Sequence, residues 1–472
     1  MNIISRKMTQ QWLELGPRFL PFADAATPDL PLSRLLRLSL FQVSVGMALV
    51  LLVGTLNRVM IVELDVPASI VGVMVALPLI FAPFRALIGF RSDMHRSVLG
   101  WRRVPFIWKG TMIQFGGLAI MPFALLVLSR TGNAANAPVW IGQLGAALAF
   151  LLVGAGLHTT QTVGLALATD LVAPESRPNV VGLMYVMMLL GMIVSALIFG
   201  MMLADFTPFK LIQVIQGCGL ATMILNVVAM WKQETRHRFP APPASAAPQF
   251  RDAFNSFLAG EKAVRRLIAV GIGTVAFSME DVLLEPYGGQ VLHLPVSATT
   301  KLTATLAVGG LIGFALASRI LSRGFDPYRM AAIGAATGVP AFLFVIFASP
   351  LHMAALFVLG TSLIGFGAGL FGHGTLTATM NAAPKSQAGL ALGAWGAVQA
   401  SAAGVAIAAG GIMRDVIGGL HVQSQFGAAT GYMAVYAVEV VLLCATLAAM
   451  LPMLRRTAAA RGAPRLPGLA AQ

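Results

Sequence analysis

Three acidic residues, Glu280, Asp281 and Glu285, stand in an otherwise apolar stretch of the chain. A carboxylate at the centre of a lipid bilayer costs roughly 2.5–3.5 kcal/mol, so such residues take up protons, find partners or line a cavity. Asp281 and Glu285 are four residues apart, a spacing that predicts one helix face on which the two like charges repel. Pro286 and Gly288 predict a break in that helix just after the acids. The alternative is an ordinary outer helix end with solvated acids.

Arg58 is a basic residue in similarly apolar surroundings. The segment 57–59 (Asn-Arg-Val) echoes the segment 280–282 (Glu-Asp-Val) at an offset of 223 residues. If the chain contains an internal duplication, this echo puts Arg58 and the acids at equivalent depths in two related halves. We therefore expect Arg58 to pair with Glu280 or Asp281, since opposite charges inside a membrane seek one another.

Arg85 and Glu439 are two further charges in apolar stretches. Arg85 lies toward the predicted inner end of its stretch, with Asp93 and Asp170 as candidate partners. Glu439 lies in the middle of the last stretch, within Ala-Val-Glu-Val-Val. It predicts either contact with another membrane component or a hydrogen bond from one helix to another.

The composition explains why so many of these charges lie in apolar runs. Of the 472 residues, 57% are hydrophobic and only 11% are charged, against about 25% in an ordinary soluble domain. This balance excludes a soluble domain and a disordered chain and indicates a membrane protein with many spans. The formal charge of +14 would suggest nucleic acid in a soluble protein, but no basic run alternates with aromatic residues. We expect membrane lipid, and no nucleic acid, as a partner.

Apolar runs of about 20 residues predict twelve transmembrane helices. Their ranges are 38–62, 69–90, 104–128, 138–169, 179–203, 208–231, 264–288, 296–321, 327–348, 350–378, 389–413 and 427–453. A Pro/Ala-rich linker, 232–263, separates an N-terminal half, 38–231, from a C-terminal half, 264–453. A second echo supports the duplication: Ala-Thr followed by Ala-Pro-Glu-Ser ends at 176, and Ala-Thr followed by Ala-Pro-Lys-Ser ends at 386. The predicted fold class is therefore an all-α integral membrane protein with the major facilitator fold.

Lysine and arginine set the predicted orientation. If the N-terminus is cytoplasmic, the inside segments hold 26 of these residues, the outside segments hold 5, and Arg85 lies within a helix. The positive-inside rule therefore predicts that the N-terminal arm, 1–37, and the tail, 454–472, both face the cytoplasm. The arm itself is either a membrane-surface segment or a plain tail.

The segment after the second predicted helix resembles the cytoplasmic loop signature of major facilitator proteins. That signature has a glycine, an aspartate four residues later, and then a glycine with paired basic residues. The matching positions here are Gly89, Asp93, Gly100, Arg102 and Arg103, although extra residues separate Asp93 from Gly100. The aspartate can cap a helix and the arginines can pair with carboxylates, which favours a conformational latch. The alternative is lipid-facing positive charge.

Four long strings resemble a particular branch of these proteins, the bacteriochlorophyll delivery family, or PucC/LhaA group, of light-harvesting assembly proteins in purple phototrophic bacteria. They are LSLFQVSVGMALVLLVGTLNRVMIVEL (38–64), FAPFRALIGFRSDMHRSVLGWRRVPFIW (81–108), ALATDLVAPESRPNVVGLMYVM (166–187) and MEDVLLEPYGGQVL (279–292). The resemblance covers residues 35–455. The arm LGPRFLPFADAA (15–26) is more similar to the LH1 assembly members than to the LH2 members.

The resemblance implies a membrane assembly factor for the light-harvesting antenna, LH1 rather than LH2. It implies binding or delivery of bacteriochlorophyll, as a transient ligand and not a required cofactor, and of antenna polypeptides. Pigment-synthesis enzymes are further candidate partners, and the implied location is the bacterial inner or intracytoplasmic photosynthetic membrane. The alternative function is a proton-coupled secondary transporter or flippase of a tetrapyrrole or another solute, in which the acids near residue 280 take up protons.

Two histidines within predicted helices, His158 and His373, are candidate pigment ligands, because an imidazole can bind the central Mg²⁺ of a chlorin. The alternative for each is a structural histidine. The sequence contains no phosphate-binding Gly-Lys-Ser/Thr loop, no His-Glu-x-x-His motif and no paired-cysteine metal site. It therefore predicts no catalytic residues, no metal and no enzymatic activity.

Overall fold

The computed structural model describes residues 31–81, 100–130, 136–172, 177–234, 263–321, 323–381, 388–420 and 427–462, and residues 85, 88, 91, 92, 95 and 97. The chain divides into two compact units. The first unit comprises Met1–Ser245 and Gly288–Ala304, and the second comprises Ala246–Tyr287 and Thr305–Gln472. The predicted halves differ from these units in 288–304, and their boundaries stay a prediction. Most of the predicted arm, linker and tail lies outside the described residues.

Every described element is helical. In chain order the elements are α2 (Leu32–Leu38), α3 (Leu40–Leu49), η2 (Val50–Leu56), η3 (Val59–Glu63), α4 (Ala68–Ala76), η4 (Leu77–Phe81), α6 (Val104–Leu128), α7 (Val139–Asp170), α8 (Arg177–Met202), α9 (Pro208–Met230), α11 (Ala263–Ala276), η7 (Glu280–Val282), α12 (Leu284–Gln290), α13 (Val296–Leu321), α14 (Pro327–Ala348), α15 (Ala354–Asn381), α16 (Ala388–Gly419) and α17 (Ala429–Gly462).

Eleven segments of the described chain are long and apolar enough to cross a membrane. The remaining predicted span, 69–90, which is the second in chain order, begins as the shorter apolar helix Ala68–Leu79. Most residues between 82 and 99 lie outside the described part, so the count of twelve stays a prediction. The chain is a multi-pass membrane protein.

The first span begins earlier than predicted, at Leu32 instead of residue 38. Leu35 of this added segment and Leu38 at the predicted start are buried and pack with Phe41 in an apolar cluster. Burial of these side chains stabilises the added helical turn, so the end of the predicted arm is helix. Farther along, η2 and η3 are π-helical, and they flank Asn57 and Arg58.

The seventh span is interrupted, but not where the sequence predicts. The α-helix stops at Ala276, a 3-10 turn covers Glu280–Val282, and a new helix starts at Leu284. Pro286 and Gly288, the predicted breakers, lie inside α12. A proline in the first turn of a helix is tolerated, because the first N–H groups have no partner within the helix anyway.

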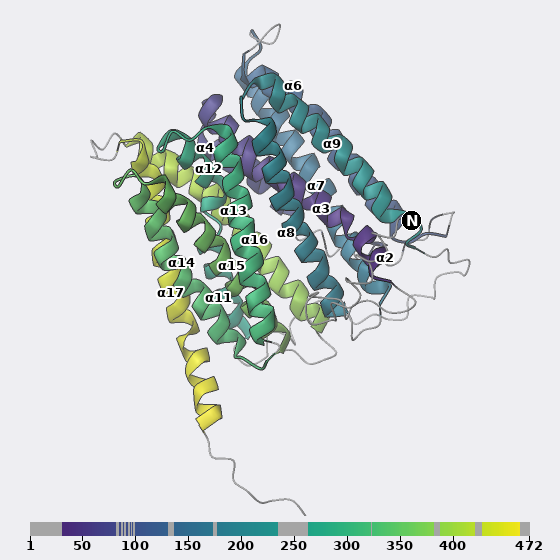
Figure 1. Ribbon diagram of the computed structural model, residues 1–472, viewed down its shortest axis with the longest axis vertical. Coiled ribbons are helices and arrows are strands. Elements are labelled where there is room, and N and C mark those ends of the chain that lie inside the picture. The colour runs from purple at the N-terminus through teal and green to yellow at the C-terminus, as the bar shows by residue number, and fades with distance from the viewer. Residues whose placement is uncertain are drawn as a thin grey trace, which may run out of the picture. The chain divides into compact units, whose positions relative to one another are not determined.

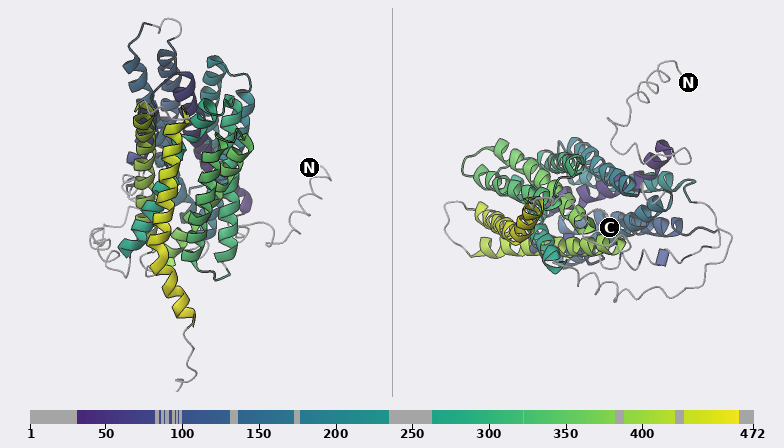
Figure 2. Two further views of the ribbon diagram at one scale, coloured as in Figure 1. Left: turned by 90° about the vertical axis from the view of Figure 1, so that its left-hand side faces the viewer. Right: turned by 90° about the horizontal axis from the view of Figure 1, so that it is seen from below.

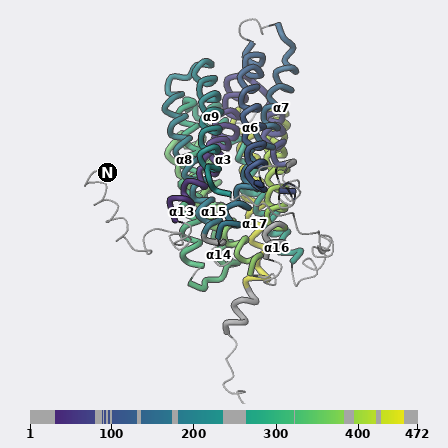
Figure 3. Tube along the Cα trace, turned by 90° about the vertical axis from the view of Figure 1, so that its right-hand side faces the viewer, coloured from purple at the N-terminus to yellow at the C-terminus, as the bar shows by residue number. Residues whose placement is uncertain are grey.

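In the first unit, α6 and α7 run side by side (Figure 3). In the same unit, α3 contacts both α8 and α9 (Figure 1). In the second unit, α17 packs on α11 and α14, and α14 also packs on α15 (Figure 2). Glycines allow some of these close approaches: Gly46 of α3 faces the backbone of Met188 and Met192 on α8.

Replacing Gly46 by alanine should destabilise the first unit. An added Cβ would lie 2.9 Å from the Met192 backbone nitrogen and closer still to the Met188 carbonyl oxygen. Neither backbone atom can move aside alone, so we expect a loss of about 1–3 kcal/mol and a lower melting temperature in detergent. Gly116→Ala is the matched control, since no atom lies within 4 Å of its added Cβ. The control should gain up to about 1 kcal/mol from helix propensity. Equal shifts for the two variants would contradict the close packing.

Candidate functional site

The two arginines of the predicted loop signature share one carboxylate in the first unit. Arg103 is 4% exposed. Its Nε donates to Asp170 Oδ2 at 3.0 Å, and its Nη1 donates to Ser92 Oγ at 2.6 Å. Arg102 forms an ion pair with the same Asp170 oxygen. Asp170 ends α7 and the arginines precede α6, so these contacts tie the two helix ends together. The role of this loop as a conformational latch stays a prediction.

A residue that the sequence analysis missed, Glu234, caps the start of α6. Its carboxylate accepts hydrogen bonds from the backbone N–H groups of Arg102, Arg103 and Val104, at 2.8–2.9 Å. These N–H groups have no partner within the helix, and their partial positive charge favours an anion. The residue expected to cap a helix here, Asp93, lies outside the described residues, as does Gly89. No local pattern identifies Glu234, because it is about 130 residues from the helix it caps.

Gly100 of the same signature has a backbone φ of +79°. Its N–H donates to Ser97 O, and the Trp101 N–H donates to Ser97 Oγ, so a tight turn precedes Arg102. A side chain other than glycine is strained at this φ. The signature glycine at this position therefore serves the turn that brings the two arginines to Asp170.

Arg85 does not pair with Asp170. Its Nε donates to Thr162 Oγ1 and its Nη2 donates to Gln161 Oε1, both at 2.9 Å. The predicted pair with Asp170 is wrong because Arg102 and Arg103 hold that carboxylate. The other predicted partner, Asp93, lies outside the described residues.

The two candidate pigment ligands lie in different units. His158 of α7 is 7% exposed, and His373 of α15 packs edge-on against the ring of Phe314, with ring centroids 4.4 Å apart. The Nδ1 atom of each histidine is buried without a hydrogen-bond partner in the described part of the chain. No group of three or more His, Cys, Asp or Glu side chains among the described residues could hold a metal ion. A role of either histidine as a chlorin ligand stays a prediction.

Arg58 pairs with a residue that the sequence analysis did not consider. Its Nη1 forms an ion pair with Glu63, and its Nη2 donates to Leu294 O at 3.2 Å. Glu63 is five residues after Arg58, a spacing that an α-helix does not bring together. This part of the span is π-helical, with Leu64 N–H donating to Val59 O, and a π-helix pairs residue i with residue i+5. The pair of Arg58 with Glu280 or Asp281 stays a prediction.

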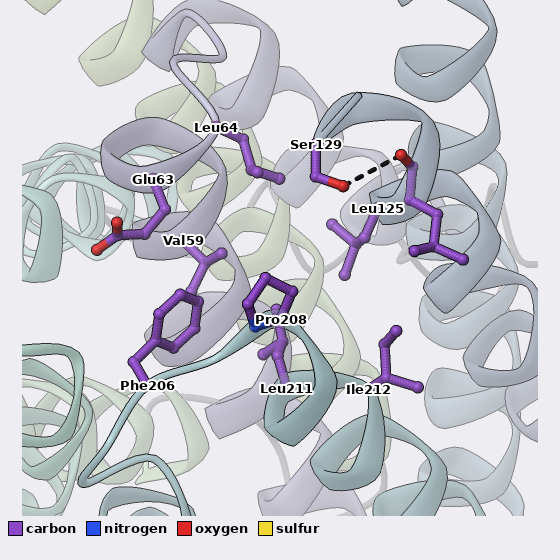
Figure 4. A pocket seen from close by; sticks show the side chains of 10 residues that line it. Val59, Glu63, Leu64, Leu125, Ser129, Phe206, Pro208, Leu211 and Ile212 are labelled. Carbon is purple, nitrogen blue, oxygen red and sulfur yellow. Dashed lines mark hydrogen bonds between the residues drawn. The ribbon is translucent and has the colours of Figure 1, made fainter. Parts of the chain in front are cut away.

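A hollow of about 280 Å³ lies beside Glu63 in the first unit (Figure 4). It is lined by residues from the ends of three spans: Val59, Glu63, Leu64, Leu125, Leu126, Ser129, Phe206, Pro208, Leu211 and Ile212. Arg58 engages Glu63, and Ser129 Oγ donates to Leu126 O at 3.1 Å. The remaining wall is apolar, so the hollow suits an apolar group.

In the second unit, Glu439 supports the interruption of the seventh span. Its Oε1 accepts the backbone N–H of Glu280 at 2.8 Å, in place of the helical carbonyl that the break removes. Glu280 is 2% exposed and Glu439 is 0% exposed. A hydrogen bond from the last span to another span is therefore present, with Glu439 as the acceptor. The protonated state predicted for Glu439 stays a prediction. Contact of the Glu439 side chain with another membrane component is excluded by its burial inside the unit.

The acids after the break are arranged differently from the predicted helix face. Asp281 belongs to the 3-10 turn and Glu285 to α12, so a four-residue helical spacing does not relate them. Glu280 and Glu285, at 2% and 3% exposure, are not solvated acids at an outer helix end. The second carboxylate oxygens of Glu280 and Glu439 are buried without a hydrogen-bond partner among the described residues. Buried carboxyl oxygens of this kind are places where a proton can bind.

Three of the five tyrosines of the chain surround this break in the second unit. The Tyr287 hydroxyl donates to Val345 O at 3.1 Å. Its ring centroid lies 5.5 Å from those of both Tyr432 and Tyr436, and Arg414 lies 4.8 Å from the Tyr432 ring centre. These aromatics were not predicted, and the signal that could have identified them is spacing: Tyr432 and Tyr436 are one helical turn apart and precede Glu439 on the same helix.

Replacing Glu439 should separate its hydrogen-bonding role from its charge. Glu439→Gln keeps an acceptor oxygen for the Glu280 N–H, so the melting temperature in detergent should stay near that of the parent chain. Glu439→Leu leaves the buried N–H unsatisfied and should cost about 1–3 kcal/mol. If the leucine variant is as stable as the glutamine variant, the Glu439 hydrogen bond does not stabilise the break.

Solved structures with similar folds are membrane transporters. A bacterial homologue of the iron transporter ferroportin in an inward-facing state is 14% identical, with a TM-score of 0.64 over 89% of this chain and 98% of its own. The nucleoside transporter NupG is also 14% identical, with a TM-score of 0.64 over 88% of this chain and 98% of its own. At such identities the likeness shows the fold alone, and it confirms the predicted all-α major facilitator fold.

Curated relatives are much closer in sequence. Protein PucC of Rhodovulum sulfidophilum is 64% identical over 88% of this chain and 92% of its own. Protein PucC of Cereibacter sphaeroides is 57% identical over 96% of this chain and 99% of its own. A more distant relative, the Bacteriochlorophyll synthase 44.5 kDa chain of Rhodobacter capsulatus, is 28% identical over 92% and 97%. A family model described as PUCC protein matches residues 55–458, and the chain therefore belongs to the PucC protein family.

Proposed function

We propose that this chain is a membrane assembly factor for the photosynthetic light-harvesting antenna. It binds or delivers bacteriochlorophyll, antenna polypeptides or both, and its client is LH1 in preference to LH2. Family membership over residues 55–458 carries this proposal, because the family resemblance implies that role. The N-terminal arm, 15–26, supports LH1 as the client by its similarity to the LH1 assembly members.

The surface of the described helices supports a role in handling apolar molecules. α8 exposes a series of large apolar side chains, among them Val194, Leu197, Ile198 and Met201. A pigment with a flat macrocycle and a long tail needs lipid-accessible apolar walls more than a polar central cavity. We place the protein in the inner or intracytoplasmic photosynthetic membrane with both termini in the cytoplasm, where pigment-synthesis enzymes can reach it.

Deleting the gene in its phototrophic host tests the assembly role. We expect the LH1 absorption band to fall several-fold and free bacteriochlorophyll to rise, with a smaller effect on the LH2 band. A plasmid copy of the gene should restore both bands, which controls for effects on neighbouring genes. Unchanged bands would exclude the assembly role, and loss of LH2 alone would exclude LH1 as the preferred client.

A second function, proton-coupled transport or flipping of a tetrapyrrole, is favoured by one observation. Glu280 and Glu439 are buried at an interrupted helix, and each has a carboxylate oxygen without a partner among the described residues. Interrupted helices and buried acids occur at the coupling sites of secondary transporters.

Flux in proteoliposomes tests this second function. If it operates, chlorophyllide movement should stop on adding an uncoupler, and Glu280→Gln should reduce the flux at least tenfold. Asp205→Asn is the control, because Asp205 is 94% exposed and forms a 3.5 Å pair with Lys210. If the parent chain shows no uncoupler-sensitive flux, the transport function is excluded, and the proposed assembly role is not affected.

A further inference from the structure

A cluster of polar side chains surrounds Arg85 inside the first unit. We call Gln42, Arg85, His158, Gln161 and Thr162 the Arg85 cluster. Gln42 comes from α3, and His158, Gln161 and Thr162 come from α7, where their spacing puts them on neighbouring positions of consecutive turns. Gln161 Nε2 donates to Gln42 Oε1 at 3.4 Å, so the amides are linked to each other as well as to Arg85.

The charge of Arg85 is not balanced within this cluster. Among the described residues, the guanidinium has two hydrogen-bond partners, Gln161 Oε1 and Thr162 Oγ1, and both are neutral oxygens. α3 and α8 contain no acidic residue, and the single acid of α7, Asp170, is held by Arg102 and Arg103. A cation in a membrane-spanning region normally pairs with an opposite charge, because neutral hydrogen bonds do not cancel its field.

Two further nitrogen atoms of the cluster lack partners. Gln42 is 0% exposed and His158 is 7% exposed. Gln42 Nε2 and His158 Nδ1 are buried without a hydrogen-bond partner in the described part of the chain. Amide N–H groups are donors, and an imidazole nitrogen is a donor when protonated at that position. Arg85 and Thr162 are only half-buried, so part of the surface of the cluster is left uncovered.

We propose that the Arg85 cluster binds the anionic oxygen group, a carboxylate or a phosphate, of an otherwise apolar molecule. The guanidinium supplies the charge and a planar fork of donors that matches two anion oxygens. The Gln42 amide contributes a further N–H from α3. Apolar neighbours such as Met188, whose sulfur contacts Gln161 Nε2 at 3.5 Å, suit the uncharged remainder of the ligand.

The two sources of such an anion differ in their consequences. In a chain that handles tetrapyrroles, the carboxylate is the free propionate of a pigment that has not received its tail, and this assignment rests on the proposed function. The phosphate is that of an anionic lipid, which requires no role in antenna assembly. The anion site itself is independent of both assignments.

Equilibrium binding to the purified full-length chain tests the site. Chlorophyllide and its methyl ester form a matched pair, since they differ only at one propionate group, which is charged in the acid and neutral in the ester. Phosphatidylglycerol and phosphatidylcholine in nanodiscs form the second pair. We expect the parent chain to bind the charged member of one pair about tenfold more tightly than its neutral partner. Arg85→Gln should remove that preference without changing the binding of the neutral partner.

Arg85→Lys and Arg130→Gln complete the set of variants. Arg85→Lys keeps the charge but loses the planar fork of donors, so it should retain part of the preference for the charged ligand. This variant replaces Arg85→Gln in the experiment if the glutamine variant does not fold. Arg130 is an exposed arginine outside the cluster, and its replacement should leave the preference unchanged.

Each outcome of this experiment decides a separate point. A preference confined to phosphatidylglycerol supports the anion site and rejects the tetrapyrrole carboxylate as its ligand. Equal binding within both pairs by the parent chain, or a preference that survives in Arg85→Gln, overturns the anion site. Failure of the assembly function is measured independently by the antenna bands of the deletion strain, so the two failures are distinguishable.

Discussion

The structure depends on one constraint, that a chain crossing a lipid bilayer must satisfy its polar groups from within. Water is absent from the hydrocarbon core, so an unpaired backbone N–H or an isolated charge is costly there. Regular helices meet the constraint for most of the backbone. The residues of functional interest are those that satisfy polar groups where a helix ends, changes its pitch or carries a charge.

Two acids provide hydrogen-bond acceptors for backbone N–H groups that have no partner within their own helix. Glu234 accepts three N–H groups at the start of α6, and Glu439 accepts the N–H of Glu280 where the seventh span is interrupted. In the second unit, Asp326 does for α14 what Glu234 does for α6, accepting from Tyr328 and Arg329. Asp326 is the residue directly before α14, whereas Glu234 is about 130 residues from α6 in the sequence. The two units therefore cap these helix starts with acids from different places in the chain.

The similar segments 57–59 and 280–282 occupy similar structural positions in the two units. Both segments lie where a span departs from the α-helix: η2 and η3 flank Asn57 and Arg58, and η7 contains Glu280 and Asp281. The same offset of 223 residues relates the first residues of α6 and α14, Val104 and Pro327. In each unit the departure is stabilised by a carboxylate from that unit, Glu63 for Arg58 and Glu439 for Glu280.

The membrane environment, the fold class and the family are all predictable from the chain before folding, because they follow from composition, from apolar runs and from long local strings. The sequence also identified Arg58, Arg85, Glu280 and Glu439 as unusual, since a charge in an apolar run is a local property. The partners of these four residues, by contrast, depend on helix pitch and on the packing of helices against one another. Glu63 contacts Arg58 because this part of the span has a π-helical repeat. Gln161 and Thr162 accept hydrogen bonds from Arg85 and lie on another helix. Glu439 accepts the N–H of Glu280, from which it is 159 residues away in the sequence. A local pattern contains neither the pitch of a helix nor the packing of distant helices, and hydrogen bonds depend on both.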